Sequence, residues 1–97
     1  MNTNVKEILV IGLGLIGSSV AKVSREKGIK VHGFDINEDS LKHALENNII
    51  DESFGSIEEI NNKNLASYID LIVIAVSPEA TKHIINGVER LWNSDIT

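Results

Sequence analysis

The chain has 97 residues, 42% of them hydrophobic, and a net charge of −5 at pH 7. This length predicts one domain with a small core, and the acidic balance without a Lys/Arg cluster argues against a nucleic acid or an anionic membrane as partner. The chain contains no cysteine, so disulfide and thiolate chemistry are excluded. The short polar start (residues 1–4) has no signal-peptide core, and the longest apolar run (residues 71–76) cannot span a bilayer. A soluble cytoplasmic domain is therefore expected.

A glycine-rich turn follows the first apolar stretch of the chain. The apolar stretch predicts a buried strand over residues 7–11, and a helix is predicted over 15–27. Two glycines, Gly12 and Gly14, lie between the strand and the helix, and Gly17 lies in the first turn of the helix. Together they form the pattern G-x-G-x-x-G. The first glycine permits a sharp turn, the second permits close approach of a pyrophosphate, and the third permits tight helix packing. Strand, turn and helix together favour a dinucleotide-binding motif, with phosphates at the positive end of the helix.

A carboxylate stands where this motif requires one. The next predicted strand covers residues 30–35 and ends at Asp35, 18 residues after Gly17. That separation is close to the roughly 20 residues of the dinucleotide fingerprint, in which the carboxylate accepts hydrogen bonds from the adenine ribose hydroxyls. The alternative is a solvated loop residue or a helix cap. The surrounding strand–helix–strand pattern favours the ribose-binding interpretation.

The helices are predicted from apolar spacing and capping residues. A second helix follows its cap at Asn37 and ends near Asn48, which can take the left-handed conformation. A third, brief helix follows a capping box formed by Ser56 and Glu59, and a fourth is predicted over 78–92. The expected inner faces consist of Ile16, Val20 and Val23 in the first helix and Leu41, Ala44 and Leu45 in the second.

Strands and helices alternate along the chain. A short third strand is expected over residues 52–54, and a fourth over 68–76, where the run is apolar at nearly every position and so predicts a strand covered on both faces. The alternation predicts an α/β fold, a Rossmann-type parallel sheet with helices on both faces and strand order 3-2-1-4, cut off before strand five is complete.

Other polar residues show no catalytic or metal-binding pattern. The three histidines, His32, His43 and His83, have no partner at a metal-ligand spacing and are interpreted as structural. Ser18 or Ser19 could contact a phosphate, but neither sits beside a general base. We therefore predict no metal site and no catalytic residue within these 97 positions.

The motifs resemble a known family. Similarity to the amino-terminal, nucleotide-binding half of the prephenate/arogenate dehydrogenases begins at the run Gly-Leu-Gly-Leu-Ile-Gly-Ser-Ser (residues 12–19). It continues through residues 33–35, 49–52 and 70–76, and covers about 5–97. The resemblance implies NAD as cofactor and, for the parent protein, oxidative decarboxylation of prephenate or arogenate in tyrosine biosynthesis. It also implies a homodimer for the full-length protein.

The chain departs from this family's pattern in two places. After the fourth strand the family often reads Ala-Val-Pro, whereas this chain reads Ala-Val-Ser-Pro (residues 75–78). Residues 94–97 resemble the start of a fifth strand, and the family's catalytic histidine and helical second domain lie beyond that strand. We therefore expect residues 1–97 to be the dinucleotide-binding domain of a larger two-domain protein, inactive as a dehydrogenase by themselves.

The expected cofactor site combines the glycine-rich turn, Asp35 and the end of the fourth strand. Ligands of open α/β sheets bind at the carboxyl ends of the strands, although a plain strand-to-helix turn at Ser77 is an equal alternative. A different class of function also remains open, namely a regulatory nucleotide-sensing module without hydride chemistry, as attached to ion channels. The predicted cofactor-binding residues are Gly12, Leu13, Gly14, Leu15, Ile16, Gly17, Asp35, Ala75, Val76 and Ser77.

Overall fold

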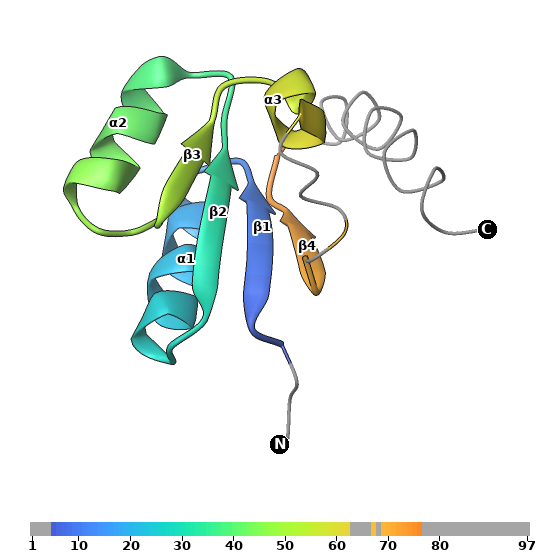
Figure 1. Cartoon of the computed structure of the whole chain (residues 1–97). Helices are drawn as coiled ribbons and strands as arrows, with labels where there is room; N and C mark the ends of the chain where they lie inside the picture. Colours follow the sequence, from blue (N-terminus) through green and yellow to red (C-terminus); the bar gives the residue numbers. More distant parts are fainter. Residues whose placement is uncertain (1–4, 63–66, 68, 77–97) are drawn as a thin grey trace.

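The computed structural model describes residues 5–62, 67 and 69–76, which are drawn in colour in Figure 1. The predicted order of strands and helices is confirmed within this part of the chain. The predicted fourth helix (78–92) lies outside it. The elements are β1 (Glu7–Ile11), α1 (Leu15–Glu26), β2 (Lys30–Phe34), α2 (Glu38–Glu46), β3 (Glu52–Phe54), α3 (Ile57–Asn62) and β4 (Leu71–Ile74).

All four strands run parallel in one sheet of order β3-β2-β1-β4, as predicted. The central strand, β1, alternates its side chains between two hydrophobic clusters. Ile8 and Val10 belong to the cluster that includes Ala21 of α1 and Leu41 of α2. Leu9 and Ile11 belong to the other cluster, which includes Ile60 of α3. Helices therefore cover both faces of the sheet, and α1 lies behind it in Figure 1.

The inner face of α1 differs from the predicted one. Ile16 and Val23 are 72% and 52% exposed, while Gly17 and Ala21 are the buried residues of the helix. Small side chains let the helix backbone approach the sheet, so the close-packed face is the one with the least side-chain volume. The prediction for α2 is confirmed for Leu41 and Ala44 but not for Leu45, which is 41% exposed.

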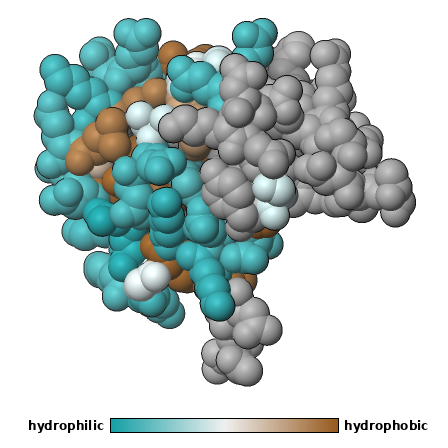
Figure 2. Space-filling view, in the orientation of Figure 1, coloured by the Kyte–Doolittle hydropathy of each residue, from teal (hydrophilic) through white to brown (hydrophobic). Residues whose placement is uncertain are grey.

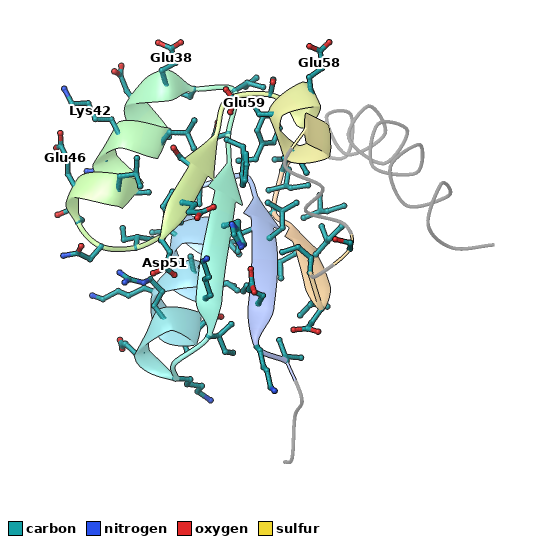
Figure 3. All side chains as sticks on the ribbon, in the orientation of Figure 1. Glu38, Lys42, Glu46, Asp51, Glu58 and Glu59 are labelled. Carbon is teal, nitrogen blue, oxygen red and sulfur yellow. The ribbon has the colours of Figure 1, made fainter. Side chains whose placement is uncertain are left out.

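A cluster at the carboxyl end of α1 ties this helix to the loop between α2 and β3. The Arg25 guanidinium lies 2.9 Å from the Asp51 carboxylate and also donates to the backbone oxygen of Asn48. Figure 3 shows Asp51 beside the start of β3. Asn48 has φ +56°, which confirms the predicted left-handed residue after α2. The cluster thus joins α1 to the loop between α2 and β3.

Side chains satisfy the amino ends of the next two helices. The Asn37 side chain accepts a hydrogen bond from the Ser40 N–H at 3.1 Å. The Ser56 hydroxyl accepts one from the Glu59 N–H at 3.2 Å, and the Glu59 carboxylate accepts one from the Gly55 N–H at 2.9 Å. The predicted capping box is therefore present, with its carboxylate one residue further back than in the standard pattern.

Strand β4 is shorter and less covered than predicted. It spans four residues, of which Leu71 is 47% exposed and Ile72 to Ile74 are half-buried. The expectation of burial on both faces is thus not met within the described residues.

The described surface in the orientation of Figure 2 is mostly hydrophilic. Glu38, Glu46 and Glu58 point outward from their helices in Figure 3. None of the helices described is long and apolar enough to cross a membrane.

Candidate dinucleotide-binding site

The turn after β1 is built on a glycine that no other residue could replace without strain. Gly12 has φ +97°, and a Cβ there would lie 2.5 Å from the carbonyl oxygen of Ala75 and 2.6 Å from a side-chain carbon of Val76. The Gly12 N–H donates to the Phe34 carbonyl at 2.8 Å. The turn therefore fits between the ends of β2 and β4.

The third glycine of the motif brings α1 against this turn. A Cβ on Gly17 would lie 1.7 Å from the carbonyl oxygen of Gly12 and 3.4 Å from the Cβ of Ala75. Two residues predicted for the site, Ala75 and Val76, are thus placed directly beside the glycine-rich loop (residues 12–17). Ser77, the third residue predicted from this segment, lies outside the described residues.

The middle glycine faces open space. Nothing in the described structure lies within 4 Å of a Cβ built on Gly14, and its φ of −76° is accessible to any residue. Neither crowding nor backbone strain therefore explains a glycine here. A ligand approaching this backbone would explain it, because the second glycine of the fingerprint allows a pyrophosphate to come close.

The amino end of α1 lacks the side-chain cap that α2 and α3 have. Gly14 is its N-cap and brings no side-chain oxygen, and no acidic residue stands in the first turn. The first N–H groups of a helix have no partner within the helix and carry the positive end of its dipole. Leu15 and Ile16, which form this turn, are 87% and 72% exposed. This helix end is therefore suited to an anionic group.

The two serines of the motif bond within the helix region. The Ser18 hydroxyl donates to the Leu13 carbonyl at 2.9 Å, and the Ser19 hydroxyl donates to the Leu15 carbonyl at 2.8 Å. Each hydroxyl keeps acceptor capacity but no free proton. A phosphate contact through a serine O–H would require one of these bonds to break.

Asp35 lies at the carboxyl end of β2, next to the glycine-rich loop. One carboxylate oxygen accepts a hydrogen bond from the Leu13 N–H at 2.8 Å, and the other accepts one from the Asn37 N–H at 2.9 Å. The sequence did not reveal the bond to Leu13. The next residue, Ile36, is 86% exposed. The sequence analysis did not name Ile36 as a candidate site residue. An apolar residue in a turn directly after the carboxylate was the signal that could have indicated it.

His32, interpreted from the sequence as structural, is fully buried in β2 between carboxylates of β1 and β3. Within the described residues no group of His, Cys, Asp and Glu is arranged to hold a metal ion. The described residues can bind an anion at the start of α1 and hydroxyl groups at Asp35.

A parallel sheet of this order, a glycine-rich turn into an uncapped helix and a carboxylate at the end of β2 define a Rossmann-type dinucleotide-binding domain. The family model for the NAD-binding domain of 3-hydroxyacyl-CoA dehydrogenase matches residues 7–91. The chain belongs to this NAD-binding family.

Solved structures support the same assignment. Prephenate dehydrogenase from Aquifex aeolicus, crystallised with hydroxyphenyl propionate and NAD+, superposes with a TM-score of 0.82 at 26% identity, covering 100% of this chain and 33% of that one. Arogenate dehydrogenase from Synechocystis gives a TM-score of 0.67 at 25% identity, covering 88% of this chain and 27% of that one. The resemblance inferred from the glycine-rich motif is confirmed.

Curated relatives come from two functional classes. Ktr system potassium uptake protein A of Vibrio alginolyticus is 31% identical over 95% of this chain and 46% of its own length. UDP-N-acetyl-D-mannosamine dehydrogenase of Methanococcus maripaludis is 33% identical over 84% of this chain and 21% of its own length. The chain thus spans less than half the length of either relative.

Proposed function

We propose that this chain is the cofactor-binding domain of an NAD-dependent dehydrogenase that acts on prephenate or arogenate. The observation that carries the proposal is the similarity of its fold to prephenate dehydrogenase over the whole chain, with a TM-score of 0.82. Hydride transfer and decarboxylation would use residues beyond these 97 positions. The same proposal includes a homodimer and a cytoplasmic location for the complete protein.

Within this proposal, the pyrophosphate of NAD binds at the open backbone of Gly14 and the first turn of α1. The adenine ribose hydroxyls bind Asp35, and the side chain of the next residue, Ile36, which is exposed, contacts the base. Ala75 and Val76, beside the glycine-rich loop, are assigned to the nicotinamide side of the site, and Ser77, outside the described residues, is assigned to it from the sequence alone. Leu13 contributes through the position of its backbone, because its side chain is only 5% exposed.

A pair of glycine variants tests the cofactor site. Gly14→Ala places a methyl group in space that the protein leaves open, so the fold should persist while NAD binding weakens. Titration calorimetry with NAD measures the affinity, and circular dichroism verifies the fold. Gly28→Ala, at the other end of α1, is a control for destabilisation: its Cβ would also meet nothing, but its φ of +83° is strained for alanine. Equal NAD affinity for Gly14→Ala and wild type would contradict this placement.

The substrate is tested on the product of the whole reading frame that encodes this chain. NADH formation is followed with prephenate, with arogenate and with a 3-hydroxyacyl-CoA, each in separate reactions. Turnover with prephenate or arogenate supports the proposal. Turnover with the 3-hydroxyacyl-CoA alone would assign the protein to a different dehydrogenase reaction.

A regulatory nucleotide-sensing module is the second candidate. The 31% identity to a potassium uptake protein over 95% of the chain favours it. Sensor domains of this kind usually carry a Gly-Asp-Ala-like segment at the third strand, whereas residues 52–54 read Glu-Ser-Phe. Glu52 also lies within ion-pair distance of His32 and Lys30. Tighter binding of ATP or ADP than of NAD would favour this candidate.

A further inference from the structure

The carboxylate of Asp35 joins two neighbouring loops at the carboxyl end of the sheet. Its oxygens accept from the Leu13 N–H at 2.8 Å and from the Asn37 N–H at 2.9 Å. Leu13 belongs to the loop between β1 and α1, and Asn37 to the loop between β2 and α2. With one bond to each loop, the carboxylate is fixed in orientation.

Leu13 is in turn held at three points. Its side chain is 5% exposed and belongs to the core cluster on the α1 and α2 face. Its carbonyl accepts the Ser18 hydroxyl at 2.9 Å, and its N–H donates to Asp35. Leu13 immediately precedes Gly14, the N-cap of α1. The bond from Asp35 therefore fixes the backbone just before the helix end that faces the open space.

On the basis of the proposed function, we propose that Asp35 is a positioning residue for the phosphate site in addition to a ligand of the ribose. Through the Leu13 N–H it holds the glycine-rich loop in the shape that directs the first N–H groups of α1 toward a pyrophosphate. An anion site of backbone N–H groups binds well only when those groups are already aligned. The ribose end and the phosphate end of the site are thereby coupled.

The two roles of Asp35 are compatible. A carboxylate has about four lone-pair positions on its two oxygens, and the bonds to Leu13 and Asn37 occupy one on each oxygen. One position on each oxygen remains to accept a ribose hydroxyl. Binding of the ribose therefore does not require the bond to the loop to break.

Removal of the Asp35 carboxylate distinguishes a positioning role from a purely electrostatic one, because the two change the affinity for a polyanion in opposite directions. Loss of a negative charge near an anion site strengthens binding of a polyanion, whereas loss of loop alignment weakens it. Inorganic pyrophosphate is the probe, since it contains no ribose. Its affinity for Asp35→Ala and for wild type is measured by NMR titration. Asp39→Ala, in the first turn of α2, removes the same charge without touching the loop.

We expect Asp35→Ala to bind pyrophosphate about tenfold more weakly, which corresponds to one charged hydrogen bond, and Asp39→Ala to bind it as well as wild type or slightly better. Unchanged or tighter binding by Asp35→Ala would overturn the proposal. Amide hydrogen exchange in the wild type provides a second test that needs no ligand. The Leu13 amide should be protected, and exchange at the rate of an unprotected amide would also overturn the proposal. Absence of both pyrophosphate and NAD binding by a wild-type chain with a protected Leu13 amide would instead contradict the proposed function.

Discussion

The imidazole Nε2 of His32 lies 2.7 Å from a carboxylate oxygen of Glu7. The other ring nitrogen lies 3.2 Å from a carboxylate oxygen of Glu52, and the ring centroid is 5.9 Å from that of Phe54. The three polar residues stand on adjacent strands, β1, β2 and β3, so a single buried ring connects them across the sheet. Both carboxylates remain partly exposed, whereas His32 is fully buried.

Removal of this ring should destabilise the domain. His32→Ala leaves a cavity in the core and two carboxylates without their shared partner, so we expect a loss of at least about 2 kcal/mol in the free energy of unfolding. His43→Ala is the matched control, because that histidine is exposed on α2, and its effect should stay under about 1 kcal/mol. Urea denaturation measures both variants. Equal stability of the two would show that the buried ring contributes little.

The third glycine should matter for folding rather than for binding. Gly17→Ala sets a methyl group 1.7 Å from the Gly12 carbonyl oxygen, which forces α1 away from the turn and should cost about 3 kcal/mol or more. In Gly14→Ala the methyl group meets nothing, so the cost should stay under about 1 kcal/mol. Thermal unfolding compares the two variants. If Gly17→Ala were as stable as Gly14→Ala, the close contact between α1 and the Gly12 turn would not be needed for stability.

Acidic pH should remove the contribution that Asp70 makes to the stability of the fold. The backbone N–H groups of Lys6 and Glu7 donate to one oxygen of this carboxylate at 2.8 and 3.0 Å, and they hold the pKa of Asp70 below its ordinary value. A carboxyl whose pKa is lowered by folding stabilises the fold above its unfolded value of about 3.9, and the stabilisation disappears as the pH falls through the folded value.

Asp70→Asn should therefore lower Tm near neutral pH, and the difference from wild type should shrink as the pH falls below about 4. Glu46→Gln serves as the control, since Glu46 lies 3.9 Å from Lys42 and both side chains point outward from α2 in Figure 3. Thermal melts over a pH series give the comparison. A Tm difference that stays constant down to the most acidic sample would contradict the assigned role.

Asp35 should also select NAD over NADP. A 2′-phosphate would meet like charge at this carboxylate, and the next residues, Ile36 and Asn37, carry no positive charge. Lys30 stands at the opposite end of β2 and lies 3.6 Å from Glu52. Asp35→Ser should weaken NAD binding by roughly tenfold or more. It should also reduce the difference in affinity between NAD and NADP. Calorimetric titration of both ligands tests this, and wild-type protein that binds NADP as tightly as NAD would disprove it.

Most of the fold could be predicted because its signals are local. The apolar run of β1, the cap at Asn37 and the left-handed Asn48 each depend on neighbours in the sequence, and the parallel order followed from the alternation of elements. The inner face of α1 could not be predicted by the same rules. Hydrophobic periodicity favours large side chains, whereas contact with the sheet is made by Gly17 and Ala21.

The candidate site was predicted in outline but not in its internal bonds. The glycine pattern and the spacing to Asp35 located the loop and the carboxylate. The bond from Leu13 to Asp35 joins residues 22 positions apart, and its existence depends on how the ends of β1 and β2 align in the folded sheet. No local pattern contains that information. The same holds for His32, whose partners Glu7 and Glu52 come from two other strands.

Helix α1 is secured at both ends. At its start, Gly17 rests on the Gly12 carbonyl, and near its end Arg25 is bound to Asp51 and Asn48. Sliding by one helical turn would displace it by about 5.4 Å, and rotation about its axis would break the same contacts. We therefore expect α1 to hold the same position before and after a ligand binds. The association rate constant should then be set by diffusion and encounter and not by rearrangement of this helix.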